Sequence, residues 1–234
     1  LNPYAAELAR VTIWIGEIQW MKKNGFDISK KPILKPLKNI ENRDALLNED
    51  GSEAVWPKAD VIVGNPPFLG NKKLIGKLGE GGVVQLRKTY PHSGAYDLVT
   101  YWFRKAAAIS ADTALRVGFV ATQSIRQGAN REVLKSILAT SVITDAWGDE
   151  PWNIDGAAVR VSLVCFASKG LEMLPHAMLD GKRVDRIFSD LKGSAAGVGS
   201  NVTQAKRLKA NKGVIFQGPV KVGAFDIPGE LARQ

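Results

Sequence analysis

The sequence predicts an α/β fold built around a mostly parallel sheet. Segments with strand and helix periodicity alternate along the chain, which is typical of parallel strands joined by helices. The clearest strand is the short β-branched run 59–64, which ends at Asn65-Pro66-Pro67 and therefore stops at a rigid loop. Residues 142–147 and 157–166 predict the last two strands. Because no helix separates them, we expect an antiparallel hairpin at the edge of the sheet.

The other elements follow from apolar spacing and from turn residues. Asn2 and Pro3 are suited to begin a helix that Asn24-Gly25 ends. The stretch 69–93 contains five glycines and several lysines, so we expect a long flexible loop there. The remaining expected elements are helices over 4–23, 96–109 and 130–138, a strand over 115–121, and a short strand within 32–47 that enters a turn near 42–44.

Length and composition predict one domain and the beginning of a second. The 234 residues are 45% hydrophobic, which fits a globular core. After Gly170 the periodic pattern weakens, and residues 193–200 are too rich in Gly, Ser and Ala to pack tightly. We therefore expect a domain over 1–170, and over 171–234 a linker with the start of another module. The sequence opens abruptly at Leu1 and stops abruptly at Gln234, so we expect it to be part of a longer protein.

Several functional classes are disfavoured by the composition. No apolar run reaches the roughly 18 to 20 residues that cross a bilayer, and no signal peptide is seen, so we expect a cytoplasmic protein. The single Cys165 lies in an apolar run and is expected to pack in the core. His92 and His176 do not have metal-ligand spacing, so no metal is expected. A net charge of +9 favours a polyanionic partner, although a solubilising surface charge is the alternative.

The chemically most specific segment is Asn65-Pro66-Pro67-Phe68. An amine conjugated to an aromatic ring is a poor nucleophile, and the Asn65 amide oxygen and the Pro66 carbonyl can both accept hydrogen bonds from it. The two prolines restrict φ and hold that carbonyl in place. Phe68 offers a face on which an extruded base can stack. Ligands of open α/β sheets bind at such carboxyl ends of strands.

This tetrapeptide after an apolar strand resembles the fourth conserved motif of DNA methyltransferases that act on exocyclic amines. The resemblance extends over most of the chain and is close to the MmeI-like (type IIL) restriction-modification enzymes, in which the loop continues as Leu69-Gly70 does here. It implies a truncated class I, Rossmann-like methyltransferase sheet. It also implies methyl transfer from S-adenosylmethionine to adenine in double-stranded DNA, in a bacterial or archaeal cytoplasm. Adenine is favoured over cytosine by the resemblance alone.

The resemblance also implies roles for single residues. Asp44 lies in a segment similar to the one whose acidic residue contacts the adenine of the cofactor. Trp102 lies in the helix motif whose aromatic side chain borders the same adenine pocket, and core packing is an equal alternative for it. Trp152 matches the segment that supplies a second aromatic ring beside the extruded base, opposite Phe68. A surface packing role is an equal alternative for Trp152.

Residues 178–234 resemble the start of the family's target-recognition domain. Its basic side chains are candidates for DNA phosphate contacts, although a solvated basic surface is an equal alternative for each of them. The candidates are Lys206, Arg207, Lys209 and Lys212.

Two parts of the family pattern are missing from this sequence. No strand is followed by the glycine-rich turn that holds the methionine part of S-adenosylmethionine, since Gly79-Glu80-Gly81-Gly82 and Gly197-Val198-Gly199 lie in expected loops. Nuclease residues are also not seen. We therefore expect the main cofactor motif to lie outside this chain, and the chain alone to be inactive. Two alternatives stay open: a methyltransferase of protein glutamine or RNA guanine, which uses almost the same loop, and a DNA-binding fragment without catalysis.

Overall fold

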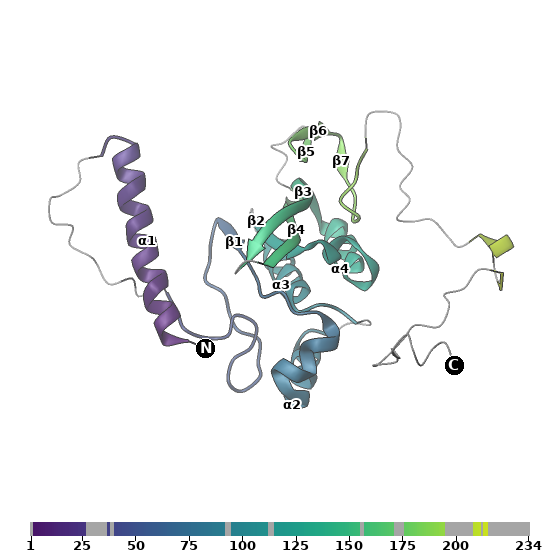
Figure 1. Ribbon diagram of the computed structural model, residues 1–234, viewed down its shortest axis with the longest axis horizontal. Coiled ribbons are helices and arrows are strands. Elements are labelled where there is room, and N and C mark those ends of the chain that lie inside the picture. The colour runs from purple at the N-terminus through teal and green to yellow at the C-terminus, as the bar shows by residue number, and fades with distance from the viewer. Residues whose placement is uncertain are drawn as a thin grey trace, which may run out of the picture. The chain divides into compact units, whose positions relative to one another are not determined.

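A computed structural model gives the structure of the chain (Figure 1). The described residues are 2–26, 37, 40–91, 95–111, 115–154, 157–170, 176–194, 208–211 and 213–214. The chain divides into two compact units, Leu1–Gly199 and Ser200–Gln234. Among the described residues, no helix is both long enough and apolar enough to cross a membrane.

A mixed sheet forms the centre of the first unit. In its described part the sheet has six strands in the order β1-β2-β4-β3-β5-β6. The strands are β1 (Val61–Gly64), β2 (Arg116–Thr122), β3 (Ser141–Ile154), β4 (Ala157–Ser168), β5 (Ala177–Leu179) and β6 (Lys182–Val184). β1 pairs with β2, and β3 with β5, in parallel, whereas the other neighbours are antiparallel. A separate short hairpin joins β7 (Arg186–Ile187) and β8 (Gly193–Ser194).

The predicted antiparallel hairpin is confirmed, but its place at the edge of the sheet is wrong. Strand β4 runs antiparallel to both neighbours and lies between β2 and β3, as the pairing of Phe166 with Val117 and with Ile143 shows. Beyond β3, strand β5 adds in parallel through the pairing of Asp145 with Met178. This pairing covers β3 only at Asp145 and Ala146, and an open strand edge favours the addition of such a strand. The sheet is consequently mixed, and the unit that holds it extends past residue 170.

The helices of the first unit differ in how they pack. The helices are α1 (Pro3–Lys23), α2 (Leu74–Thr89), α3 (Val99–Ala111) and α4 (Gly128–Thr140), and the single-turn helices are η1 (Asn71–Lys73) and η2 (Gln123–Arg126). α3 and α4 contact each other and pack on one face of the sheet. The Phe103 ring of α3 lies edge-on to Phe119 at 5.2 Å and stacks on Phe166 at 6.1 Å. Burying each such side chain contributes about 1.5 to 3 kcal/mol.

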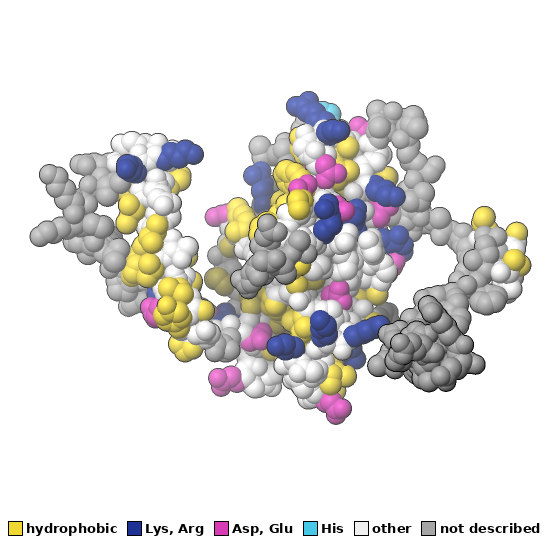
Figure 2. Space-filling view, viewed as in Figure 1, with side chains coloured by type: hydrophobic (Ala, Val, Ile, Leu, Met, Phe, Trp, Pro, Cys, Tyr) yellow, Lys and Arg dark blue, Asp and Glu magenta, His cyan; other side chains and the backbone are white. Residues whose placement is uncertain are grey.

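Helix α1 is confirmed where the sequence predicts it. The Asn2 side chain accepts hydrogen bonds from the N–H groups of Tyr4 and Ala5, which caps the first turn. None of the helix residues is buried, and Trp20 is 58% exposed. Figure 2 shows apolar side chains along the length of α1 on the face in view. The Arg10 guanidinium links α1 to later residues by donating to the carbonyls of Leu37 and Ile40.

The prediction of a long loop over 69–93 is wrong, because η1 and α2 occupy most of that stretch. Three apolar side chains of α2 are buried against Tyr90 and the start of α3 in a second cluster. Glycines lower intrinsic helix stability, but packing of an apolar face outweighs that cost. Gly79 has a φ of 72°, which kinks the helix without a Cβ clash. The second cluster consists of Leu46, Leu74, Val83, Leu86, Tyr90, Leu98 and Tyr101.

The other sequence predictions differ mainly in length. The strands expected at 115–121 and 157–166 and the helix expected at 130–138 are confirmed as β2, β4 and α4. Strand β3 continues beyond its expected end at Trp147, through a shift in register between Trp147 and Glu150. Most of the strand expected within 32–47 lies outside the described residues.

Candidate functional site

The Asn65–Phe68 loop leaves β1 at the edge of the sheet where β2 and β3 also end. β1 pairs in parallel with β2, and β3 runs in the same direction because the antiparallel β4 lies between them. The turn η2 after β2 and the far end of β3, which carries Trp152, therefore lie at this same edge. This is the carboxyl edge, where open α/β sheets bind ligands.

The loop residues differ in their exposure in a way that suits their expected roles. Asn65 is exposed, and its side chain makes no hydrogen bond with any residue that the structure describes. Pro66 is buried and anchors the loop, whereas Pro67 is exposed and Phe68 is half-buried. The amide oxygen of Asn65 is thus available to a ligand, and the backbone next to it is restrained by two prolines.

A polar cluster that the sequence analysis missed holds the exit of this loop. The Asp97 carboxylate accepts hydrogen bonds from the Asn71 N–H (2.9 Å), the Ser124 hydroxyl (2.9 Å) and the Asn130 amide (2.7 Å). In addition, the Leu98 N–H donates to the Leu69 carbonyl at 2.8 Å. The only available signal in the sequence was an acidic residue in the first turn of the helix expected over 96–109, which the structure begins at Val99.

Asp44 and Trp102, the expected cofactor contacts, border the second apolar cluster. Asp44 is exposed, and its Oδ1 accepts from the N–H groups of Leu46 at 2.7 Å and Leu47 at 3.1 Å. Leu46 is buried in that cluster, and Leu69 and Trp102 pack against it. The structure therefore brings the Asp44 turn, the exit of the loop and Trp102 together around the same apolar side chains. Trp102 also packs on the main core, as its core-packing alternative expects.

Trp152 lies on β3 near the carboxyl edge, where it pairs with Val159 and is 37% exposed. Within the described part of the chain, no ring contact joins Trp152 to Phe68. Asp149, just before it, pairs with Arg160 and with Arg126 at 3.3 Å. The hydrogen bond from Arg160 is the main reason that the pKa of Asp149 lies below its ordinary value. These pairs restrain the irregular part of β3 that precedes Trp152.

Only one of the four expected phosphate contacts can be placed. Lys209 begins the short helix η4 (Lys209–Asn211) of the second unit and is exposed. The other three, Lys206, Arg207 and Lys212, lie outside the described residues. On the face of the molecule seen in Figure 2, Lys and Arg side chains are interspersed with Asp and Glu. The net charge alone therefore does not define a binding surface.

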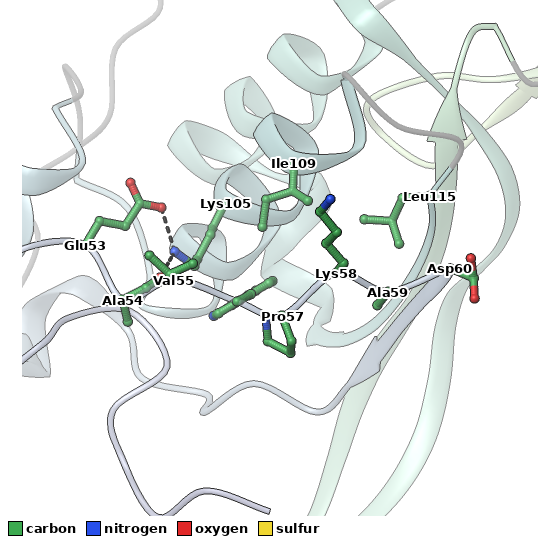
Figure 3. Close-up of a pocket in the computed structure, with 11 residues that line it drawn as sticks. Glu53, Ala54, Val55, Pro57, Lys58, Ala59, Asp60, Lys105, Ile109 and Leu115 are labelled. Carbon is green, nitrogen blue, oxygen red and sulfur yellow. Dashed lines mark hydrogen bonds and ion pairs between the residues drawn. The ribbon is translucent and has the colours of Figure 1, made fainter. Parts of the chain in front are cut away.

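A cavity of about 770 Å³ lies near the amino ends of β1 and β2, away from the loop edge (Figure 3). The ammonium of Lys105, whose side chain is 2% exposed, donates to Glu53 Oε1 at 2.6 Å and to the Ala54 carbonyl. It also lies 5.1 Å from the centre of the Trp56 ring. These interactions attach residues 53–56 to α3 and satisfy the buried charge. Lys105, which lines the cavity, thus helps to hold this part of the fold together.

Cys165 is half-buried on β4. Burial raises the pKa of its thiol, and the nearby Asp145 raises it further. A raised pKa leaves little of the reactive thiolate at neutral pH. This fits the expected packing role of Cys165.

The fold is α/β with a mixed sheet, and it presents an Asn-Pro-Pro-Phe loop at the carboxyl end of β1. These two features fit the methyltransferase class. The chain belongs to the family of MmeI DNA-methyltransferase domains, because the model of that family, described as "MmeI, DNA-methyltransferase domain", matches residues 1–174. This confirms the resemblance stated from the sequence.

Individual relatives match a smaller part of the chain. DNA methyltransferase A of Bacillus subtilis (strain 168) is 28% identical over 146 residues, which are 57% of this chain and 16% of that protein. Among solved structures, the type IIL restriction-modification enzyme MmeI in complex with DNA is 25% identical, with a TM-score of 0.47. That match covers 57% of this chain and 19% of the MmeI chain. The chain thus spans less than a fifth of either relative.

Proposed function

We propose that the polypeptide carrying this domain transfers a methyl group from S-adenosylmethionine to the exocyclic amine of adenine in double-stranded DNA, as part of a restriction-modification system. The observation that carries the proposal is the Asn65–Phe68 loop at the carboxyl edge of the sheet. Two prolines restrain its backbone, and the exposed Asn65 amide makes no hydrogen bond with any described residue. Membership of the MmeI methyltransferase family supports DNA as the substrate.

The proposed mechanism needs no strong base on the protein. The Asn65 Oδ1 and the Pro66 carbonyl each accept a hydrogen bond from one N–H of the amine. The nitrogen lone pair is then free to attack the methyl group. The cofactor, when bound, supplies an electrophilic methyl group on a sulfonium. The two acceptors are positioned before the reaction, so most of the barrier reduction comes from orientation and electrostatics. As the new carbon–nitrogen bond forms, the bond between that methyl group and the sulfonium would break, and the demethylated cofactor would leave as a neutral thioether. The methylated amine would then lose one proton to water.

Two aromatic side chains are proposed to hold the extruded base. Phe68 follows the two prolines directly, and stacking on its ring offsets part of the few kcal/mol that base extrusion costs. Trp152 is proposed to approach the base from the opposite side. It is partly exposed at the same edge of the sheet and available for such contact.

The adenine moiety of the cofactor is proposed to lie between Asp44 and Trp102. Both border one apolar cluster that the loop exit also contacts. The exposed Asp44 carboxylate can accept from an adenine or ribose donor, and the half-buried indole of Trp102 provides an apolar wall. Residues 171–234 are proposed to begin the target-recognition module, with their basic side chains at DNA phosphates.

The test uses the full-length polypeptide and S-adenosylmethionine with a tritiated methyl group. Unmethylated genomic DNA is the acceptor, and the product is digested to nucleosides to identify the methylated base. The expected result is label in methyladenine, which is lost in the Asn65→Ala variant. Parallel reactions contain RNA and release-factor protein. The proposal would be contradicted if the label entered only RNA or only release-factor protein, or if it entered DNA only at cytosine.

A further inference from the structure

The exit of the Asn65–Phe68 loop is attached to the rest of the domain through one carboxylate. Asp97 lies directly before α3 and is half-buried. Its Oδ1 accepts from the backbone N–H of Asn71, three residues beyond Phe68, at 2.9 Å. Its Oδ2 accepts from Ser124 at 2.9 Å and from Asn130 at 2.7 Å. Asp97 therefore joins the loop exit to η2 and to α4.

With Asn130 opposite it, this cluster favours an acceptor-only side chain at Asp97. The groups that face its two oxygens are an N–H, a hydroxyl and an NH₂ group. A carboxylate can accept from all of them, whereas an asparagine would direct its own NH₂ at a donor. Asn130 is only 7% exposed, and its own oxygen accepts from the Asp97 N–H at 2.9 Å. Unpaired donors in such a buried place are costly.

We propose that Asp97, oriented by Asn130, is a positioning residue for methyl transfer. Its hydrogen bond to the Asn71 N–H fixes the position of the backbone between Phe68 and Asn71. The Leu98–Leu69 backbone hydrogen bond adds a second attachment of the same stretch. Asn65 and Phe68 then have their reactive positions before the base arrives, and Asp97 touches neither the base nor the cofactor. The inference rests on the proposed function of this loop.

The experiment compares the full-length polypeptide with Asp97→Asn, Asn130→Asp and the double variant that exchanges the two residues. In the double variant one carboxylate again faces one amide, with the two groups exchanged between positions 97 and 130. The amide at 97 can then donate its NH₂ to the carboxylate at 130. Asp60→Asn is the matched control, because Asp60 is an exposed carboxylate before β1 at the opposite edge of the sheet. Melting temperatures identify any variant that fails to fold.

The first readout is hydrogen exchange of the peptide that contains Asn71. Exchange is expected to become about tenfold faster in Asp97→Asn, because a hydrogen bond to a charged acceptor is lost. It should return toward the wild-type rate in the double variant and stay unchanged in Asp60→Asn. Ser124→Ala removes one of the donors and should give a smaller increase. Unchanged exchange in both Asp97→Asn and Ser124→Ala would overturn the proposal.

The second readout is single-turnover methylation of DNA at saturating DNA and cofactor. The rate is expected to fall by about ten- to a hundredfold in Asp97→Asn, because a small displacement of a reacting group has an effect of this size. DNA and cofactor dissociation constants should change less than about twofold, since binding contacts are retained. Faster exchange with an unchanged methylation rate would overturn the positioning role. A wild-type protein that methylates no DNA would refute the proposed function, while the exchange results would still test the attachment.

Discussion

Asp97 and Asn130 bind each other through two hydrogen bonds of opposite direction. The Asp97 backbone N–H donates to Asn130 Oδ1 at 2.9 Å, and the Asn130 NH₂ donates to Asp97 Oδ2 at 2.7 Å. The pair joins the beginning of α3 to the first turn of α4 at the carboxyl edge of the sheet. Both helices are thereby linked to each other close to Asn71, which also bonds to Asp97.

This pair is expected to contribute to folding stability. Asn130→Ala removes both bonds and leaves the partly buried Asp97 N–H without its partner, so we expect a loss of about 2 kcal/mol in the free energy of unfolding. Urea unfolding followed by circular dichroism measures it. Lys135→Ala, at an exposed position of the same helix, should change stability by less than about 0.5 kcal/mol. Equal effects of the two substitutions would show that the pair does not stabilise the domain.

Asn65→Ala in the full-length polypeptide should abolish methyl transfer and leave DNA binding largely intact. The lost acceptor acts on the reacting amine, whereas most DNA affinity comes from phosphate contacts. Asn65→Asp is the matched comparison, because it keeps an acceptor oxygen and should retain more activity than Asn65→Ala. Single-turnover methylation and a DNA-binding titration measure the two properties. A parallel loss of DNA affinity would indicate that Asn65 supports the fold or the DNA surface.

Phe68→Ala should slow methylation more on a normal duplex than on one whose target adenine is mismatched. The truncation removes stacking worth about 1 to 3 kcal/mol per base, and a mismatched base is easier to extrude. Phe68→Trp should keep substantial activity if the larger ring fits. Single-turnover rates of each variant on both duplexes give the answer. If Phe68→Ala loses the same factor on both, Phe68 packs the loop and does not hold the base.

The 234-residue chain by itself should bind S-adenosylmethionine weakly. In the proposed pocket, Asp44 and Trp102 supply one side only, and none of the strands expected from the sequence leads into a glycine-rich turn. We expect a dissociation constant above about 10 μM, which corresponds to less than roughly 7 kcal/mol of binding. Calorimetry with the chain, and with the full-length polypeptide for comparison, measures it. Tighter binding by the isolated chain would show that its own residues suffice for the cofactor.

The ion pairs of Asp149 should make stability depend on pH at the acidic end. Arg160, and to a lesser extent Arg126, hold the pKa of Asp149 below its ordinary value of 3.8. A carboxyl whose pKa is lower in the folded state stabilises the fold above its unfolded pKa, and this contribution is lost as the pH falls through its folded pKa. Wild type should therefore melt at a higher temperature than Asp149→Asn at neutral pH, and the difference should shrink below pH 3.8. A difference that does not change with pH would exclude this charge effect.

Local patterns in the sequence were sufficient for the elements that frame the loop. The run before Asn65 is β-branched and apolar, and in β2 every second residue is buried, so both strands can be recognised without knowing their neighbours. The proposed role of Asn65 also follows from the sequence, because its amide oxygen and the Pro66 carbonyl are two acceptors of the kind that a conjugated amine would need. Helix α2 could not be recognised in this way, since its stability comes from contacts with Tyr90, Leu98 and Tyr101.

The sequence by itself determined the order of most strands and helices, the loop proposed to carry the chemistry and the family to which the chain belongs. Only the tertiary structure decided that β4 lies between β2 and β3, that β5 extends the sheet, and that Asp97 meets Asn71, Ser124 and Asn130. The physical reason is the range of the interactions. Periodicity and turn chemistry act over a few residues, whereas strand order and polar clusters depend on backbone and side-chain groups that come together only when distant segments have packed.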